Sequence, residues 1–371
     1  MVSLLQELKA DKVQTLHIDR RSVFGRGAKS SSLSLETLET YDSDTDDESF
    51  SESSSSSMAS IEEEQSFWLS MLLTRIKAAS NIEHVILHDE VLTSQTTPEF
   101  LTSSFSQLLR SLPHLPKLRR LRIYVSRRCA MDYSVLKEVI QASPQLEQLI
   151  ICDGSMWEEP PADIAFALTS RQQVDELAST IRYHPSLVEV SFQECFVASH
   201  LSLDPIVAAM ATLPRLEMIN ITLTQSSVQR LLDASIVKLF EVQTLQDVTL
   251  WSMGLDDEHM QAIRDVLPLH PCLVFLSLRC NPKISSKGWQ TLCEMVEQNF
   301  VLRSVYTDEI VPPERENLLQ TFLYWNQCGR GSLLQSHDPQ LWQETMERWK
   351  NDATAVYYLV RQGNPCLFSS T

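Results

Sequence analysis

The sequence predicts an α/β solenoid, a stack of about eight helix–strand units that share one continuous core. Two observations carry this prediction. A strand pattern recurs at a nearly constant spacing, and apolar residues recur at fixed distances before it. The chain has 371 residues and is 43% hydrophobic. That is enough for a large core or for a row of small cores laid end to end.

The strand pattern is L-x-x-L-x-L with apolar substitutions allowed. Its eight copies start at Ile82, Leu118, Leu146, Leu187, Leu216, Leu245, Leu273 and Leu302. Successive copies are 36, 28, 41, 29, 29, 28 and 29 residues apart, so five of the seven spacings are 28 or 29. The two longer spacings fit the same period with inserts of about 8 and about 12 residues. A closing Asn281 or Cys195 follows the pattern in two copies.

The helix pattern is independent of these strand positions. Six residues before each copy stand only apolar residues: Ile76, Leu112, Ile140, Ile181, Met210, Leu239, Leu267 and Val296. Ten residues before, the set is apolar except for Ser235: Leu72, Leu108, Leu136, Leu177, Ile206, Ser235, Ile263 and Leu292. A separation of four marks the buried stripe of a helix. Two residues before five copies stands a proline that ends the helix: Pro116, Pro144, Pro185, Pro214 and Pro271.

A unit of helix, proline-marked turn and short strand resembles the ribonuclease-inhibitor-like leucine-rich-repeat family. The resemblance covers residues 66–310 and implies a horseshoe with a parallel inner sheet and outer helices. It also implies a concave face that binds proteins. Members of the family include inhibitors, adaptors, receptors and GTPase activators, so the resemblance does not identify a partner.

The two ends depart from the pattern. Residues 1–19 are expected to form a short helix and strand, which either packs on the first repeat as a half-unit or hangs as a loose tail. Residues 20–65 are rich in Ser and acidic side chains and are expected to be a disordered linker. Residues 311–371 are expected to form a helical cap that holds Trp325, Trp342 and Trp349, because a terminal repeat exposes an apolar face.

Charge and cysteine content exclude several classes of protein. Residues 34–64 contain eleven acidic residues and no Lys or Arg, and removing them from the net charge of −17 leaves −6. Nucleic-acid binding through a basic field is therefore not expected. The eight cysteines include no C-x-x-C pair, so free thiols in the cytoplasm, or in the nucleus, are expected. No membrane span, cofactor or metal site is expected.

Alternation along each strand predicts which side chains face the concave surface. At its C-terminal end these include Trp251, Phe275, Arg279 and Tyr306. Trp, Tyr and Arg carry much of the binding energy in protein interfaces, so this cluster is a candidate partner-binding site. The alternatives are that the cap covers it or that it is an ordinary mixture of surface residues.

The N-terminal end of the same face carries Arg120, Arg122 and Tyr124, with His84 and His88 beside them. This end could bind an anion or an acidic peptide. Alternatively, the acidic segment of the chain itself, residues 34–64, could make an intramolecular contact with it. Both alternatives remain open at this stage.

The acidic segment also contains possible phosphorylation sites. Ser43, Thr45, Ser49 and Ser60 each have an acidic residue three positions later, a context that acidophilic kinases favour. Composition alone could also produce such matches, because the segment is built of Ser, Asp and Glu.

We expect a non-enzymatic scaffold or adaptor that binds a protein partner on its concave face. The alternative is a regulatory activator of a small GTPase, as in one branch of the family. In that branch the acidic segment follows the repeats, whereas here it precedes them. An assay of GTP hydrolysis across small GTPases would separate the two. No group of residues with catalytic spacing supports an enzyme.

Overall fold

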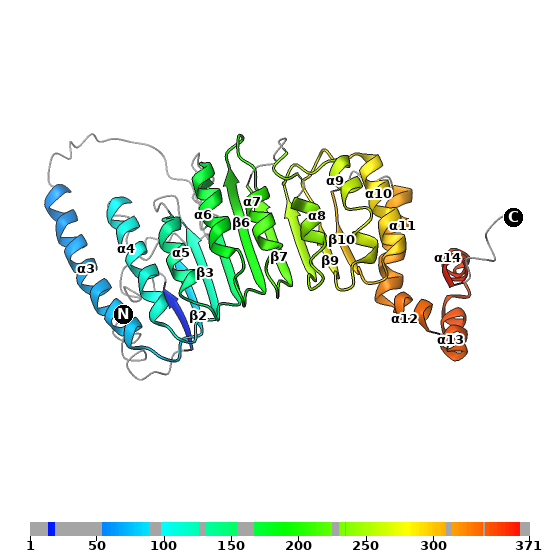
Figure 1. The fold of residues 1–371 in the computed structure, drawn as a ribbon, viewed down its shortest axis with the longest axis horizontal. Coiled ribbons are helices and arrows are strands. Elements are labelled where there is room, and N and C mark those ends of the chain that lie inside the picture. The colour runs from blue at the N-terminus through cyan, green and yellow to red at the C-terminus, as the bar shows by residue number, and fades with distance from the viewer. Residues whose placement is uncertain are drawn as a thin grey trace, which may run out of the picture. The chain divides into compact units, whose positions relative to one another are not determined.

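The computed structural model describes residues 14–18, 54–88, 98–125, 131–153, 167–224, 230–233, 235–308, 313–336 and 338–363. The chain divides into two compact units, Met1–Phe166 and Ala167–Thr371. In each unit helices and strands alternate along the chain (Figure 1).

The first unit is built on parallel strands in the order β1-β2-β3-β4. Its described elements are β1 (Thr15–Ile18), α3 (Ser54–Ala78), β2 (His84–His88), α4 (Pro98–Ser111), the 3-10 helix η2 (Leu112–His114), β3 (Arg120–Val125), α5 (Tyr133–Gln141) and β4 (Gln148–Asp153). The pairing register follows the repeat, because His84 lies opposite Arg120 and Arg120 opposite Gln148. Equivalent positions of successive repeats therefore lie side by side.

Strand β1 shows that the end of residues 1–19 packs on the first repeat and is not a loose tail. Residues Thr15–Ile18 pair in parallel with β2, and Thr15 lies opposite His84. Leu16 and Ile18 are 0% exposed. The sheet therefore contains one more copy of the strand pattern, which precedes the eight copies found in the sequence. The helix expected ahead of β1 lies outside the described residues.

Helix α3 starts earlier than its apolar stripe predicts. The helix includes residues 54–65, which the composition assigned to the disordered linker. Leu69, Leu72 and Ile76 are buried and anchor its C-terminal half. Adding residues to an anchored helix requires no new nucleation, and glutamate is a good helix former. The rest of the expected linker, residues 20–53, lies outside the described residues.

The second unit contains parallel strands in the order β6-β7-β8-β9-β10, with β5 beside β6. Its repeat elements are β5 (Ala167–Leu168), α6 (Arg171–Ile181), β6 (Glu189–Val197), α7 (Asp204–Met210), β7 (Met218–Leu223), α8 (Ser235–Phe240), β8 (Asp247–Trp251), α9 (Asp257–Ala262), the 3-10 helix η4 (Leu267–Leu269), β9 (Phe275–Ser277), α10 (Ser286–Gln298) and β10 (Ser304–Tyr306). Its remaining helices are α11 (Pro313–Gln327), α12 (Arg330–Gln335), α13 (Pro339–Trp349) and α14 (Ala353–Gly363).

The core has the register that the sequence predicts. The first residues of all eight strand patterns are at most 1% exposed, and the eight residues six positions earlier are all 0% exposed. The residues ten positions earlier are also buried, including Ser235. The five prolines lie in the turns between helix and strand. Among the described residues, helices thus cover one face of the strands in each unit, and none covers the other face.

The C-terminal helices begin as one more repeat and then depart from it. Leu319, Leu323 and Asn326 on α11 precede Gly329 by ten, six and three residues, which are the repeat spacings, and all three are buried. At Gly329, φ is 87°, a left-handed conformation that glycine adopts without steric cost. The chain therefore turns into α12, which the sequence pattern did not predict, instead of forming another strand.

Candidate binding surfaces

The open face of the strands, here called the strand face, carries the four C-terminal candidates as two contacting pairs. Trp251 on β8 with Arg279 in the turn after β9, and Phe275 on β9 with Tyr306 on β10, form what we call the aromatic patch. The guanidinium carbon of Arg279 lies 5.3 Å from the centroid of the Trp251 ring. The rings of Phe275 and Tyr306 are 5.2 Å apart. Tyr306 is 51% exposed, so the described cap residues leave it open.

The turn behind the aromatic patch is fixed by the closing asparagine of the repeat. Asn281 is 1% exposed, and its Nδ2 donates to the carbonyl oxygens of Leu250 and Leu278, each at 2.9 Å. Its Oδ1 accepts from the backbone N–H of Leu255 at 3.1 Å. These bonds join successive repeats just after Arg279, so the backbone that carries the arginine is held in place.

Asp247 lies on the strand face opposite Phe275 and is expected to destabilise the fold at neutral pH. Burial, together with the nearby Glu189 carboxylate, raises the pKa of Asp247 to about 6. The folded state therefore binds this proton more tightly than the unfolded state, and stability is lost as the pH rises through 6. Asp247→Asn should raise the free energy of unfolding near pH 8 by about 1 kcal/mol, a figure reduced for solvent screening.

Urea unfolding of Asp247→Asn and the wild type at about pH 8 and about pH 4 tests this expectation. The gain should nearly vanish at the lower pH, where the folded wild type already carries the proton. An equal difference at both pH values would show that ionisation of Asp247 has no part in it.

The N-terminal candidates also lie together, and β1 adds a residue that the sequence had not singled out. Tyr124 stacks on His88 at 4.2 Å with 11° between the rings, and the guanidinium carbon of Arg122 is 5.1 Å from the Tyr124 centroid. His17 approaches His88 at 5.1 Å. The sequence contains a signal for His17, because it occupies an outward-facing position of a further copy of the strand pattern that starts at Val13.

Some outward positions are less exposed than simple alternation predicts. Cys152, Ser191, Thr222 and Ser277 are at most 7% exposed. Their side chains are short, and the residues opposite three of them in register are the longer Tyr124, Trp251 and Tyr306. Of the possible phosphorylation sites, Ser43, Thr45 and Ser49 lie outside the described residues. Ser60 lies on α3, where its side chain is not described.

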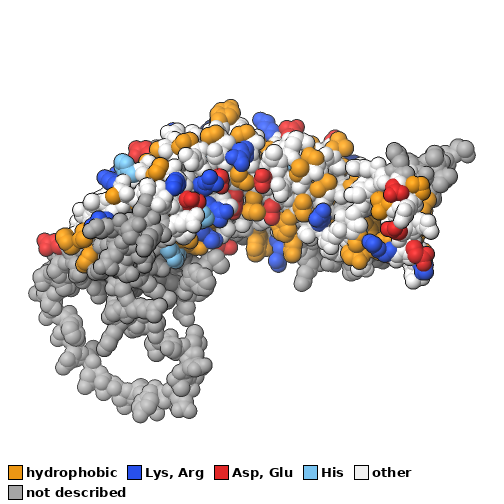
Figure 2. Space-filling view, turned by 90° about the horizontal axis from the view of Figure 1, so that it is seen from below, with side chains coloured by type: hydrophobic (Ala, Val, Ile, Leu, Met, Phe, Trp, Pro, Cys, Tyr) orange, Lys and Arg blue, Asp and Glu red, His pale blue; other side chains and the backbone are white. Residues whose placement is uncertain are grey.

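Hydrophobic side chains are common elsewhere on the surface. On the face shown in Figure 2 they are scattered among charged side chains of both signs. Single exposed apolar residues are normal on proteins. The aromatic patch differs because its members touch one another in pairs.

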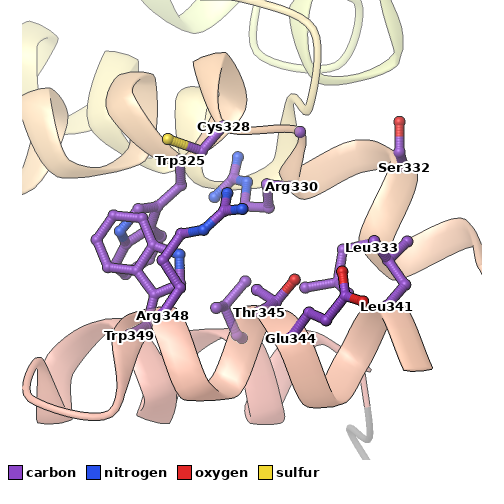
Figure 3. Close-up of a pocket in the computed structure, with 12 residues that line it drawn as sticks. Trp325, Cys328, Arg330, Ser332, Leu333, Leu341, Glu344, Thr345, Arg348 and Trp349 are labelled. Carbon is purple, nitrogen blue, oxygen red and sulfur yellow. The ribbon is translucent and has the colours of Figure 1, made fainter. Parts of the chain in front are cut away.

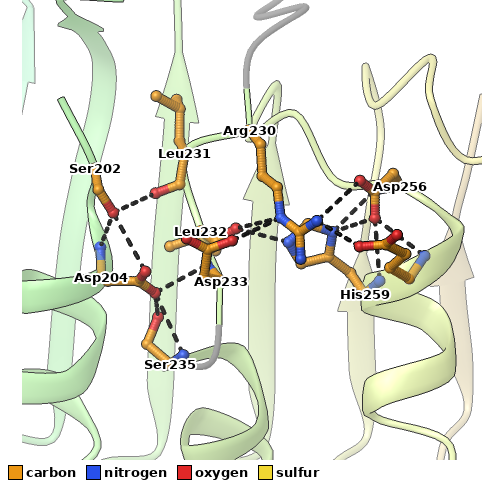
Figure 4. A network of polar contacts seen from close by, with 10 residues as sticks. Ser202, Asp204, Arg230, Leu231, Leu232, Asp233, Ser235, Asp256 and His259 are labelled. Atoms are coloured by element: carbon orange, nitrogen blue, oxygen red, sulfur yellow. Dashed lines mark hydrogen bonds and ion pairs between the residues drawn. The ribbon is translucent and has the colours of Figure 1, made fainter. Parts of the chain in front are cut away.

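A polar network joins successive repeats on the helix side of the second unit, and the sequence did not predict it (Figure 4). Asp204 accepts hydrogen bonds from Ser235 Oγ and from the backbone N–H of Asp233, which explains the polar exception in the helix pattern. His259 has one ring nitrogen 2.6 Å from Asp256, while its Nε2 donates to the Leu232 carbonyl at 2.8 Å. Since its ring is 1% exposed, His259 is structural and cannot reach a substrate.

A second set of buried polar residues, His270, Asn299, Asn326 and Arg330, forms what we call the polar ladder. Nε2 of His270 donates to the Val242 carbonyl of the preceding repeat. Asn299 donates in turn to the His270 carbonyl, and Asn326 donates to the Asn299 carbonyl. His270 and Asn299 each stand three residues before a strand pattern. This recurrence was the signal available in the sequence.

His270 should make stability fall in weak acid. Burial lowers its pKa, and Nδ1 accepts the backbone N–H of Leu273, so the neutral ring is favoured. The contribution is complete above the ordinary value of about 6.5 and is lost as the pH falls towards the lowered pKa. His270→Asn should lose less stability than the wild type between about pH 7.5 and about pH 5, because asparagine makes equivalent bonds at position 299 and does not titrate.

The exposed His200 provides a matched control. Urea unfolding of His200→Asn should show the wild-type pH dependence. If His270→Asn and the wild type lost the same stability over this range, the assignment to His270 would be wrong.

A cavity of about 150 Å³ lies among the C-terminal helices (Figure 3). Arg330 on α12 and Arg348 on α13 extend into the space between their helices. Two lining side chains have a nitrogen without a hydrogen-bond partner among the described residues, Nε1 of Trp325 and Nη1 of Arg330. Both nitrogens are shielded from solvent, so a ligand in the cavity could not reach them in this arrangement.

No protein-family model matches the chain, and no curated protein matches it. In the described segments, no helix combines the length and apolar character needed to cross a bilayer. Those segments also contain no cluster of three or more His, Cys, Asp or Glu side chains that could hold a metal ion. No cysteine in those segments forms a disulfide.

Proposed function

We propose that this chain is a leucine-rich-repeat scaffold of the ribonuclease-inhibitor-like type that binds a protein through its strand face. The observation that supports this most is the aromatic patch, two contacting pairs of partly or fully exposed side chains, Trp251–Arg279 and Phe275–Tyr306, on β8–β10 and the turn after β9. Such residues dominate binding energy when they become buried against a partner.

A folded protein partner suits the chemistry of the patch. Arg279 offers several hydrogen-bond donors on a guanidinium held near Trp251, and Tyr306 offers a ring with a hydroxyl group. Pre-paired side chains lose little conformational freedom when they bind. Neither the cavity among the C-terminal helices nor the hollow lined by residues 171–179 of α6 is lined by a residue of the patch.

Affinity capture from native cell extract tests this function. The wild type is compared with Trp251→Ala/Tyr306→Ala, which removes the two aromatic residues of the patch that also carry a hydrogen-bonding group. The matched control, Tyr183→Ala/Leu269→Ala, removes side chains that are 71% and 81% exposed outside the strand face. We expect a protein retained by the wild type and the control but lost with the patch variant. Identical captured sets would reject the patch.

A further inference from the structure

We propose that the strand face of β1–β3 is a second binding site and that it takes an acidic peptide segment of a partner protein. The site consists of His17, His84, His88, Arg120, Arg122 and Tyr124, here called the basic face. It lies in the first unit, whereas the aromatic patch lies in the second. This inference therefore goes beyond the proposed function and does not depend on it.

The basic face is continuous across three paired strands. Ring contacts run from His17 to His88 at 5.1 Å and from His88 to Tyr124 at 4.2 Å, and the Arg122 guanidinium carbon lies 5.1 Å from Tyr124. The parallel register aligns the outward-facing residues of the three strands, because Thr15, His84 and Arg120 occupy equivalent positions. Three strands span about 10 Å, the width of a short extended peptide with its side chains.

The charge of this face is one-sided. The outward positions of β1–β4, up to and including Cys152, carry no Asp or Glu. Asp153, which follows, is 4% exposed. Neither Arg120 nor Arg122 forms an ion pair with a described residue. The neighbouring Arg119 does form one, with Glu147 at 3.5 Å.

An acidic peptide fits these features better than a nucleic acid does. Guanidinium groups pair with carboxylates through charge-assisted hydrogen bonds, and two arginines suffice for a short segment. Nucleic acid needs an extended basic field, while this chain has a net charge of −17. The aromatic rings offer a flat surface on which peptide backbone and apolar side chains can pack.

The chain itself supplies a test peptide. Residues 34–53 contain eight acidic residues and no basic one. A fluorescent synthetic peptide with this sequence is titrated into the full-length wild type. It is also titrated into a full-length variant in which these eight residues are changed to Asn or Gln. The second protein removes any competition from the chain's own acidic segment.

Two charge-matched pairs of substitutions are made in both proteins. Arg120→Gln/Arg122→Gln removes the arginines of the basic face, while Arg75→Gln/Arg110→Gln removes two arginines on α3 and α4. We expect the wild type to bind the peptide, and raising the salt from about 50 to about 300 mM should weaken binding strongly. The Arg120/Arg122 pair should weaken binding at least tenfold, and the control pair less than twofold.

Three outcomes would overturn the proposal. Unchanged affinity in the Arg120/Arg122 variant, or no binding to either protein, would reject the basic face as a peptide site. Binding only to the neutralised protein would reject a partner's segment and assign the face to the chain's own residues 34–53. None of these outcomes depends on the capture experiment, so the two proposals fail separately.

Discussion

Replacing Arg330 with alanine is expected to lower the free energy of unfolding by about 3 kcal/mol or more. The side chain is 2% exposed, and its guanidinium makes three hydrogen bonds. Nε donates to Asn326 at 2.8 Å, and Nη2 donates to the carbonyl oxygens of Val296 at 2.9 Å and Asn299 at 2.7 Å. These bonds tie the first turn of α12 to the end of α10.

Aromatic rings complete the surroundings of this arginine. Its guanidinium carbon lies 5.0 Å from the Phe300 centroid and 5.1 Å from the Phe322 centroid. Burial lowers the pKa of Arg330 to about 10, so the group still carries its charge at neutral pH. Removing it leaves a cavity and takes one donor each from Asn326 Oδ1 and from the Val296 and Asn299 carbonyl oxygens, and both effects destabilise the cap.

Hydrogen exchange and urea unfolding measure this effect. Arg330→Ala should increase backbone hydrogen exchange most in α12 to α14, because Arg330, the last member of the polar ladder, attaches α12 to the helices before it. Arg330→Lys should recover little of the loss, because one ammonium group cannot reproduce a planar fork. Arg348→Ala, an exposed arginine on α13, is the control and should change stability by less than about 0.5 kcal/mol. Equal unfolding curves for Arg330→Ala and this control would contradict the account.

The periodic part of the fold is predictable because equivalent residues of successive repeats are buried in the same way. A residue at a fixed distance from the strand pattern has an equivalent environment in every repeat. Ile140 and Leu239, each six residues before a strand pattern, are therefore both fully buried. The pairing register follows for the same reason. Position 235 was the exception in sequence, and its serine is buried through hydrogen bonds to Asp204, which a hydrophobic pattern cannot reveal.

The cap and the start of α3 were less predictable. From the sequence alone, Arg330 would be assigned to the surface, since isolated arginines are rarely buried. Its burial depends on Asn326 and on the carbonyl groups of Val296 and Asn299 at the C-terminal end of α10. These partners come together only after α11 takes the place of a ninth repeat helix. The N-terminal half of α3 looked like linker because low apolar content does not distinguish a polar helix from a chain without structure.

For the binding surfaces, alternation along the strands found the residues but not their contacts. The pairs Trp251–Arg279 and Phe275–Tyr306 follow from adjacent strands in register, with side-chain conformations that no sequence pattern specifies. His17 was missed because its strand stands far from the repeats in sequence, although β1 pairs directly with β2.

Loss of the aromatic patch should weaken binding of the captured partner by at least about 2 kcal/mol, roughly thirtyfold in Kd. Trp251 supports the Arg279 guanidinium, and Tyr306 covers Phe275, so the double substitution removes one member of each pair. The remaining arginine and phenylalanine would then be held less firmly. Because these side chains are outward-facing, the fold itself should keep its stability within about 1 kcal/mol.

The most direct test is a titration of the purified partner against three full-length proteins: the wild type, Trp251→Ala/Tyr306→Ala and Tyr183→Ala/Leu269→Ala. Calorimetry gives Kd for each, and unfolding curves confirm that all three are folded. We expect the patch variant to bind at least about thirtyfold more weakly, while the control stays within twofold of the wild type. Equal affinity for all three proteins would contradict binding through the strand face of β8–β10.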